Sequence, residues 1–452
     1  MIEKYYNGVI EQVAGGIGNV EHNSILVRYS NDFSIWDLES VNHYKDQTDI
    51  FFTCHEFSYN KIAEAYEPYL GLIRQMFHKY CSGTLEEFME ECDVYKLQRP
   101  VFESYFEKGF CERTEQILID EVEYEQERMR NSIVTMLQKL SEIRPVVIVL
   151  NRFQLASKST MQLSNSLLQV KNKNIGIVLG VNDVQSIPEF AHEEWDAICE
   201  SMDDRNMVYH IGNAGRNMEP DVMDYYSDYE SDDGYRKLNN LVYFLDFDQA
   251  DHHLSKIERR IKFDNFTISE KKHYQLLLLQ IMVSVLQRDI AKALESCEDL
   301  EKLQDQEKEG AFYYNFWMAT SYMYLGKLEE AMIYVQKAKE CGEALGDDFL
   351  VFRAELLKAQ NQMSGWCNIF FCAQDIEISD KLIEKLNAYH YKNHLAHIYI
   401  YAYDNKPEIV AKAYRSEAFL IYFSKGVALA KEIGNEQLIS IAYRKNIMIA
   451  ST

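Results

Sequence analysis

At 452 residues, of which 47% are hydrophobic and only six are proline, the chain is long enough for two or three domains with full-sized cores. Its formal net charge of −24 repels phosphate backbones and anionic membranes, which argues against nucleic-acid binding by this chain alone. The nine cysteines are dispersed without a CxxC pair, and no apolar run approaches the roughly 18 residues of a membrane span. We therefore expect a cytoplasmic protein with reduced thiols, no signal peptide and no membrane segment.

The N-terminal segment predicts a strand, a glycine-rich turn and a helix. The expected strand is Gly8–Ala14, and the turn that follows it contains Gly15, Gly16 and Gly18. Apolar residues then recur at the spacing of one helical face, at Ile25, Leu26, Tyr29 and Phe33. A strand, a glycine turn and a helix form the plan of a phosphate-binding loop, because bare backbone amides and a helix N-terminus attract anions.

The motif that such a loop normally carries is incomplete here. Its spacing, GxxxxGK[ST], places a lysine directly before the hydroxyl residue. Counting back from Ser24, the lysine position holds Asn23 and the second glycine position holds His22. The point charge that would contact the β- and γ-phosphates is therefore absent.

A buried strand is predicted at Val146–Leu150, an apolar run with Pro145 in front of it and polar residues behind. A turn and an amphipathic helix follow, with apolar positions at Met161, Leu163, Leu167 and Leu168. In P-loop nucleotidases such a strand ends in an acidic residue that holds magnesium or polarises water. Here it ends at Asn151, whose amide does not supply that negative charge.

Strands and helices alternate up to about residue 215. Apolar runs predict further strands at Asp49–Cys54, Asn174–Val181 and Met207–Ile211. Helices are expected at Tyr59–Tyr80, Thr84–Val94 and Glu112–Ile143. Thr84 and Glu87 have the spacing of a capping box. Strands separated by helices of this length predict βαβ units and a parallel sheet.

The segment 216–236 breaks this alternation. It places acidic residues among tyrosines, at Asp221, Asp224, Asp228, Glu230, Asp232 and Asp233. The order of oxygen ligands in an EF-hand calcium loop, with its closing glutamate, is absent. We interpret the segment as a solvated acidic linker.

From residue 237 to residue 452 the pattern is helix after helix. The clearest unit is Ala311–Gly346, in which two amphipathic helices meet at Gly326, where a tight turn favours a residue without Cβ. Small and apolar residues line the two facing sides: Met318, Ala319 and Tyr322, then Ala331, Val335 and Ala338. Related stretches occur at Asp246–Ile261, Ser269–Leu303 and Lys425–Leu438. The pattern predicts a solenoid of tetratricopeptide-like repeats.

Three histidines, His390, His394 and His397, share one face of a predicted helix at a spacing that zinc sites also use. Their surroundings are rich in aromatic residues, as in packed helical repeats. We therefore favour a packing role over a metal site.

Together these features resemble the STAND class of signal-transduction P-loop ATPases, with C-terminal tetratricopeptide repeats. The resemblance is carried by four stretches: Gly8–Tyr29, Asp49–Tyr80, Pro145–Leu168 and Asn174–Asp183. It implies an α/β domain of the parallel-sheet, P-loop-NTPase type at 1–215, the acidic linker at 216–236 and an all-α, TPR-like solenoid at 237–452. It also implies a switch driven by nucleotide and inducer. The chain departs from the family at Asn23, at Asn151 and at Asp183, where a positive charge would help.

We therefore expect a non-catalytic signalling or scaffold protein with a pseudo-ATPase N-terminal domain and no bound metal. The degenerate nucleotide site, which would take ATP or ADP, would comprise Gly15, Gly16, Gly18, Asn23, Ser24 and Asn151. A protein or peptide partner would contact four aromatic residues of the repeats, Phe312, Tyr313, Phe316 and Trp317. Two alternatives remain open: a nucleotide-binding regulatory switch, and the sensory part of a longer transcriptional or cyclase regulator.

Overall fold

The computed structural model of the chain describes residues 2–450 except 19–22, 31–33, 46–48, 59–60, 97, 112–121, 171, 183–186, 204–206, 212–228, 230, 265, 365–379, 390 and 402–416. The chain divides into two compact units. We call the first the sheet unit; it comprises Met1–Val94, Gln98–Thr114 and Asp120–Asp264. We call the second the helical unit; it comprises Asn265–Thr452 with Tyr95–Leu97 and Glu115–Ile119.

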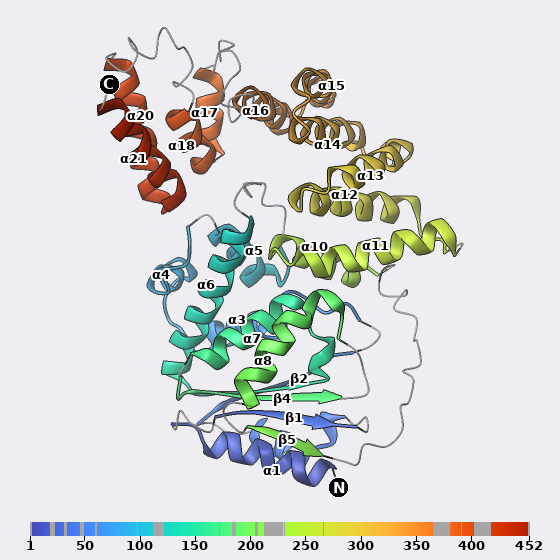
Figure 1. Cartoon of the computed structure of the whole chain (residues 1–452), viewed down its shortest axis with the longest axis vertical. Helices are drawn as coiled ribbons and strands as arrows, with labels where there is room; N and C mark the ends of the chain where they lie inside the picture. The colour runs from blue at the N-terminus through green and yellow to red at the C-terminus, as the bar shows by residue number, and fades with distance from the viewer. Residues whose placement is uncertain are drawn as a thin grey trace. The chain divides into compact units, whose positions relative to one another are not determined.

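The sheet unit contains a parallel sheet of five strands in the order β2-β3-β4-β1-β5. The strands are β1 (Ser24–Tyr29), β2 (Phe51–Glu56), β3 (Val146–Asn151), β4 (Ile175–Asn182) and β5 (Val208–Ile211). The helices are α1 (Ile2–Gly15), α2 (Glu39–Lys45), α3 (Tyr69–Tyr80), α4 (Leu85–Glu91), α5 (Arg99–Lys108), α6 (Val122–Ile143), α7 (Lys158–Gln169), α8 (His192–Asp203), α10 (Asp232–Tyr243) and α11 (Phe247–Phe263). Short 3-10 turns are η1 (Ile35–Asp37), η3 (Phe153–Leu155) and η4 (Glu189–Ala191). Figure 1 shows α1 on one side of the sheet and α3, α7 and α8 on the other.

The central strand predicted from the apolar run is confirmed. All six residues of β3 are buried, and β3 lies between β2 and β4. Helix α7 buries Met161, Leu163, Leu167 and Leu168 against the sheet unit's core, as its periodicity predicted. The capping box of α4 is also confirmed, since the Glu87 N–H donates to Thr84 Oγ1 and the Thr84 N–H donates back to Glu87 Oε2. Helix α3, by contrast, begins only after Pro68.

The prediction for the N-terminal segment is wrong. Gly8–Ala14 belongs to α1, and the residues expected to form a helix form β1 instead. The helical period begins before Gly8, and its apolar positions all lie in the core: Tyr6, Val9, Ile10 and Val13. Residues 25–29 are apolar enough to suit either period, and pairing with β4 and β5 selects the strand.

The sheet unit extends further along the chain than expected. Residues 216–228 lie outside the described residues, but α10 begins at Asp232, within the predicted acidic linker. Helices α10 and α11 belong to the sheet unit rather than to the helical unit. Asp246, the N-cap residue of α11, accepts a hydrogen bond from the Ser159 N–H of α7, and Lys158 forms an ion pair of 2.6 Å with Asp248. These bonds hold α11 against the N-terminus of α7.

Where the connections of the helical unit are described, its helices follow one another after only a few residues. They are α12 (Glu270–Leu286), α13 (Ile290–Lys302), α14 (Gly310–Tyr324), α15 (Leu328–Leu345), α16 (Asp348–Ser364), α17 (Asp380–Ala388), α18 (Lys392–Tyr401), α20 (Glu417–Ile433) and α21 (Glu436–Ala450), with the 3-10 turn η5 at Gln304–Gln306. Helices α14 and α15 pack through Ala319 and Val335, and Ala331 and Ala338 are fully buried. The paired helices predicted around Gly326 are therefore confirmed.

Five of the described turns in the helical unit share one backbone closure. The N–H of one residue bonds the carbonyl five positions earlier, and this occurs at Asp289, Lys327, Asp347, Tyr391 and Asn435. Where the preceding residue is described it has positive φ: Arg288, Gly326, Gly346 and Gly434. This is the Schellman arrangement, which satisfies carbonyls at a helix C-terminus. Only the glycines of this series are visible as a sequence signal.

Gly326→Ala is expected to destabilise the protein by about 1 kcal/mol, because φ at Gly326 is 71° although no atom lies within 4 Å of the added Cβ. Gly8→Ala is the matched control, since Gly8 lies inside α1 with equally open space. That substitution should stabilise the protein by about 0.5–1 kcal/mol through helix propensity. Urea unfolding measures both changes, and equal effects at the two positions would contradict this account.

Candidate functional site

The carboxyl ends of the strands bring together polar side chains that are distant in sequence. Open α/β sheets bind their ligands outside this edge. Asn151 ends β3, Glu56 ends β2 and Tyr29 ends β1. Asn151 and Glu56 are directly paired in the sheet register. We call this group, together with Arg152 and Ser34, the carboxyl-edge network.

The side chains of this network bond to one another. The Tyr29 hydroxyl donates to Asn151 Oδ1 at 2.8 Å, and Asn151 Nδ2 lies 3.5 Å from Glu56 Oε2. Arg152 Nη1 lies 3.0 Å from Glu56 Oε1. Asn151 and Tyr29 are essentially inaccessible to solvent, with exposed fractions of 0% and 1%. The amide that replaces the expected aspartate is thus a bonded core residue.

The segment after β1 bonds the same glutamate. The Ile35 N–H donates to Glu56 Oε2 at 2.8 Å, and the Ser34 hydroxyl lies 3.3 Å from that oxygen. In the strand–loop–helix plan, this segment stands where a phosphate-binding loop would follow the first strand. Its sequence from residue 30 to residue 38, SNDFSIWDL, contains neither glycine nor lysine. A triphosphate would find no glycine-rich backbone cradle there.

Helix α1 closes this edge from one face of the sheet. Gly180 in β4 has no side chain, and a Cβ there would overlap the Tyr6 hydroxyl of α1 and come within 2.7 Å of Asn151 Oδ1. Tyr6 is fully buried, and burial raises its pKa well above the ordinary tyrosine value. The space above β4 is therefore filled by Tyr6 and Asn151.

The structure separates the residues predicted to bind nucleotide. Gly15, Gly16, Gly18, Asn23 and Ser24 lie at the amino end of β1, whereas Asn151 lies at the carboxyl end of β3. Five strand steps from Ser24 to Tyr29 span about 17 Å. The predicted set therefore cannot form one site.

Three members at the amino end have local structural roles. Gly18 has a φ of 96°, and its N–H donates to the Lys173 carbonyl at 2.7 Å. Asn23 is 8% exposed, and its Nδ2 donates to the carbonyls of Asn172 and Ile175. Ser24 is the first residue of β1. These contacts tie the start of β1 to the segment that leads into β4.

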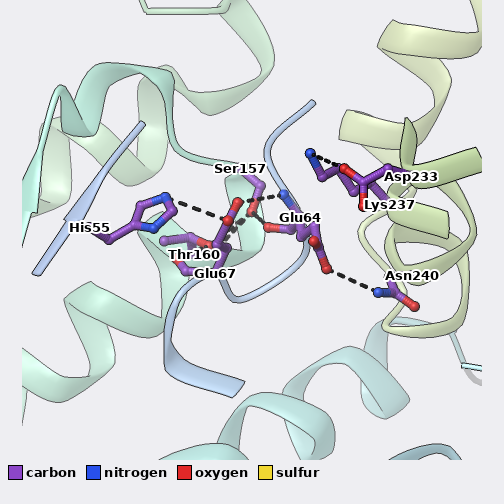
Figure 2. Close-up of polar contacts among 8 residues, drawn as sticks. All are labelled: His55, Glu64, Glu67, Ser157, Thr160, Asp233, Lys237 and Asn240. Carbon is purple, nitrogen blue, oxygen red and sulfur yellow. Dashed lines mark hydrogen bonds and ion pairs between the residues drawn. The ribbon is translucent and has the colours of Figure 1, made fainter. Parts of the chain in front are cut away.

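A second polar cluster lies where the loop after β2 crosses the N-terminus of α7. Figure 2 shows Glu64 and Glu67 side by side, with the Ser157 hydroxyl donating to the Glu64 carbonyl and the Thr160 hydroxyl to the Glu67 carbonyl. Asn240 of α10 donates to Glu64 Oε2 at 3.0 Å, and His55 Nε2 lies 3.5 Å from Glu67 Oε1. We call Glu64 and Glu67 the acidic pair. Together with the residues that bond to it, the acidic pair links β2, α7 and α10.

Burial perturbs the titration of this cluster. The pKa of Glu64 is raised to about 7, chiefly by burial and then by the neighbouring Glu67 charge, against the Asn240 bond and Lys237. Burial also raises the pKa of Glu67. The pKa of His55 is lowered to about 4, chiefly by burial. Nearby charges on α10 are Lys237 and Asp233, which form an ion pair of 3.0 Å (Figure 2). The Glu64 and Glu67 carboxyl groups therefore lie close together but have different surroundings.

Half of the predicted partner-binding set is inaccessible. Phe312 and Tyr313 are 0% and 5% exposed, in a core cluster with Ala338, Leu350 and Ala354. Their role in binding a partner is therefore a wrong prediction, because both point into the interior of the helical unit. Phe316 and Trp317 are only half-buried, and the Arg353 guanidinium lies 4.3 Å from the centre of the Phe316 ring.

Of the histidine triplet, for which the sequence favours packing, His394 is 6% exposed and His397 is half-buried. The pKa values of His394 and His397 are lowered to about 3 and about 4, chiefly by burial. His390 lies outside the described residues. Within the residues that the structure places, no group of three histidine, cysteine or acidic side chains is arranged to hold a metal ion.

The sequence reading missed Glu56, Arg152, Tyr6 and the acidic pair. One signal for Glu56 was available, since the predicted strand Asp49–Cys54 continues to an acidic residue two positions further on. No local signal places Tyr6 above Gly180, because that contact joins a helix to a strand more than 170 positions away along the chain.

Comparison with protein-family models, curated proteins and solved structures found no match to this chain. Among the helices placed by the structure, none is both long and apolar enough to cross a bilayer. The seven cysteines within the described ranges are free thiols.

Proposed function

We propose that this chain is a non-catalytic signalling or scaffold protein. Its sheet unit is a P-loop-like domain without nucleotide chemistry, and its helical unit binds a protein or peptide partner through tetratricopeptide-like repeats. The observation that carries the proposal is the carboxyl-edge network, in which Tyr29, Asn151, Glu56 and Arg152 bond to one another. ATP hydrolysis would need a metal ligand and a phosphate clamp at this edge.

The parallel sheet is compatible with a P-loop-like domain. The order β2-β3-β4-β1-β5 differs from the Rossmann and flavodoxin orders, and every strand pairing in it is parallel, as the predicted βαβ units imply. Fold alone does not establish function, because one fold serves many chemistries. The proposal therefore depends on the site, where an amide stands at the end of β3 and a segment without glycine or lysine follows β1.

Partner binding is supported by the helical unit's exposed apolar side chains. Leu325, Ile333 and Leu345 on the α14–α15 pair are 45%, 56% and 41% exposed, in contrast to the buried Phe312 and Tyr313. These residues are spread along α15 and the turn before it, so a partner that contacts them would lie along the helix pair, as extended partners do on solenoid surfaces. We therefore propose that a partner contacts these residues rather than the buried aromatic residues.

Calorimetry with ATP, ADP and GTP, each with magnesium, tests the proposal on the full chain. We expect no binding at micromolar to millimolar concentrations and no nucleotide turnover. Micromolar binding without turnover would favour the second candidate, a nucleotide-binding switch, for which the parallel α/β sheet is the supporting observation. Magnesium-dependent turnover that disappears in Asn151→Ala would contradict both.

A further inference from the structure

Glu56 is surrounded by hydrogen-bond donors from two segments that are distant in sequence. Ile35 contributes a main-chain N–H and Ser34 a hydroxyl, both on the segment after β1. Arg152, directly after β3, contributes a guanidinium, and Asn151 contributes its amide at a longer distance of 3.5 Å. The Glu56 and Arg152 side chains are only 11% and 17% exposed. These donors form a partly buried anion site, and the chain's own Glu56 carboxylate occupies it.

The donors are of the kinds that bind phosphate oxygens elsewhere. Backbone N–H groups, hydroxyls and a planar guanidinium all serve phosphate and carboxylate alike. Their position is also that of a phosphate site, at the carboxyl edge of a parallel sheet and on the segment after β1. A carboxylate and a phosphate therefore compete for the same donors if both are available.

We infer that the Glu56 carboxylate occupies an oxyanion-binding site at the carboxyl edge of the sheet, and that removing it lets a phosphate-type oxyanion bind to Arg152, Ser34 and the Ile35 N–H. The inference rests on the proposed function in one respect, since an internal carboxylate at this site explains why a P-loop-like domain does not bind nucleotide. The chain itself supplies the anion.

Backbone conformation at Arg152 fits this role. Arg152 has a φ of 53°, in the left-handed region that residues with a Cβ seldom adopt. This conformation directly follows β3, and the side chain reaches Glu56 at the end of the neighbouring strand. Truncating Glu56 would remove the carboxylate that lies 3.0 Å from the largely buried Arg152 guanidinium, which favours uptake of another anion.

The test uses the full chain with Glu56→Ala and follows thermal unfolding in phosphate, pyrophosphate, ADP or ATP against sodium chloride of equal ionic strength. For Glu56→Ala we expect phosphate at about 50 mM to raise Tm by roughly 3–5 °C relative to chloride. The wild type should show no such difference. Adding Arg152→Ala to Glu56→Ala should abolish the phosphate effect, because the guanidinium is the charged donor.

Glu91→Ala is the matched control. It removes a carboxylate from a different ion pair, with Lys139 at 3.6 Å, whose side chains are 62% and 43% exposed. Phosphate should not raise its Tm above that in chloride. An equal phosphate effect in this variant, in the wild type, or in the Glu56→Ala, Arg152→Ala double variant would overturn the inference.

If Glu56→Ala is recovered only unfolded, refolding from urea replaces the thermal measurement. Phosphate should then raise the refolded yield over chloride at equal ionic strength, and an unchanged yield would overturn the inference. Comparing the ligands separates a general oxyanion site, where phosphate and ATP act alike at equal concentration, from a nucleotide site, where ATP acts at lower concentration. Both results support an oxyanion site occupied by Glu56. Nucleotide binding by the wild type would instead defeat the proposed function, and that is measured separately by calorimetry.

Discussion

Asn151→Asp is expected to destabilise the protein by about 2–4 kcal/mol near neutral pH, rather than to create a magnesium site. The new carboxylate would lie beside Glu56, whose Oε2 is now 3.5 Å from Asn151 Nδ2, at a position that solvent does not reach. The substitution would also replace the Nδ2 donor of the amide with a carboxylate oxygen, which is a second acceptor. Urea unfolding at pH 7 measures the loss, and an ATPase assay on the folded variant should detect no turnover.

The double substitution Asn151→Asp with Glu56→Gln is the control, because it restores one acid and one amide at the paired positions. We expect it to recover most of the lost stability, which a double-mutant cycle would report as a strong coupling. Destabilisation by Asn151→Asp should also diminish at low pH, where one of the two carboxyl groups is protonated. A stable Asn151→Asp variant at pH 7 would show that the network tolerates a second charge and would contradict this account.

Glu64→Gln is expected to stabilise the protein increasingly as pH rises, by about 1–3 kcal/mol at pH 8 and by little at pH 5. The reason is that the pKa of Glu64 is raised to about 7 in the folded chain from an ordinary value of 4.5. The folded chain therefore holds this proton more tightly than the unfolded chain. That contribution to stability is fully present below pH 4.5 and is lost as pH rises through about 7. The glutamine keeps an acceptor for Asn240 without the buried charge.

His55 produces the opposite dependence. The pKa of His55 is lowered to about 4 from 6.5, so the folded protein loses stability as pH falls below 6.5. The two effects oppose each other between pH 4.5 and 6.5, and above pH 6.5 the Glu64 effect is free of the His55 effect. Urea unfolding of the wild type and Glu64→Gln at pH 5, 6, 7 and 8 measures the difference. Glu91→Gln, at a carboxylate 62% exposed, should show a difference that does not change with pH. If the stability difference between the wild type and Glu64→Gln also stays constant with pH, ionisation of Glu64 does not cause the pH dependence.

The predictions that were confirmed depend on short stretches of chain. The strand at Val146–Leu150 and the helix with Met161 and Leu163 carry their own periodicities, and the turn at Gly326 carries its own backbone requirement. The capping box at Thr84 and Glu87 is local as well. Each of these signals lies within a few residues of the structure that it specifies, and neighbouring elements do not compete with it.

The candidate site was predicted less well because its parts are brought together by pairing between strands. Glycines at residues 15–18 suggested a phosphate loop, yet they lie at the opposite edge of the sheet from Asn151. The choice between helix and strand for residues 25–29 was decided by two neighbouring strands, one of which follows some 180 positions later. Register then set which side chains meet at the carboxyl edge.

The sequence by itself determined that the chain has an alternating α/β part followed by paired helices, and that residue 151 is an amide where an acid was expected. Only the tertiary structure decided what that amide does. The pairing of β2 with β3 places Glu56 beside Asn151, and Arg152 and the segment after β1 complete its surroundings. Periodicity depends on spacing along the chain, whereas hydrogen bonds and ion pairs depend on distances in space, and strand order and register establish those distances.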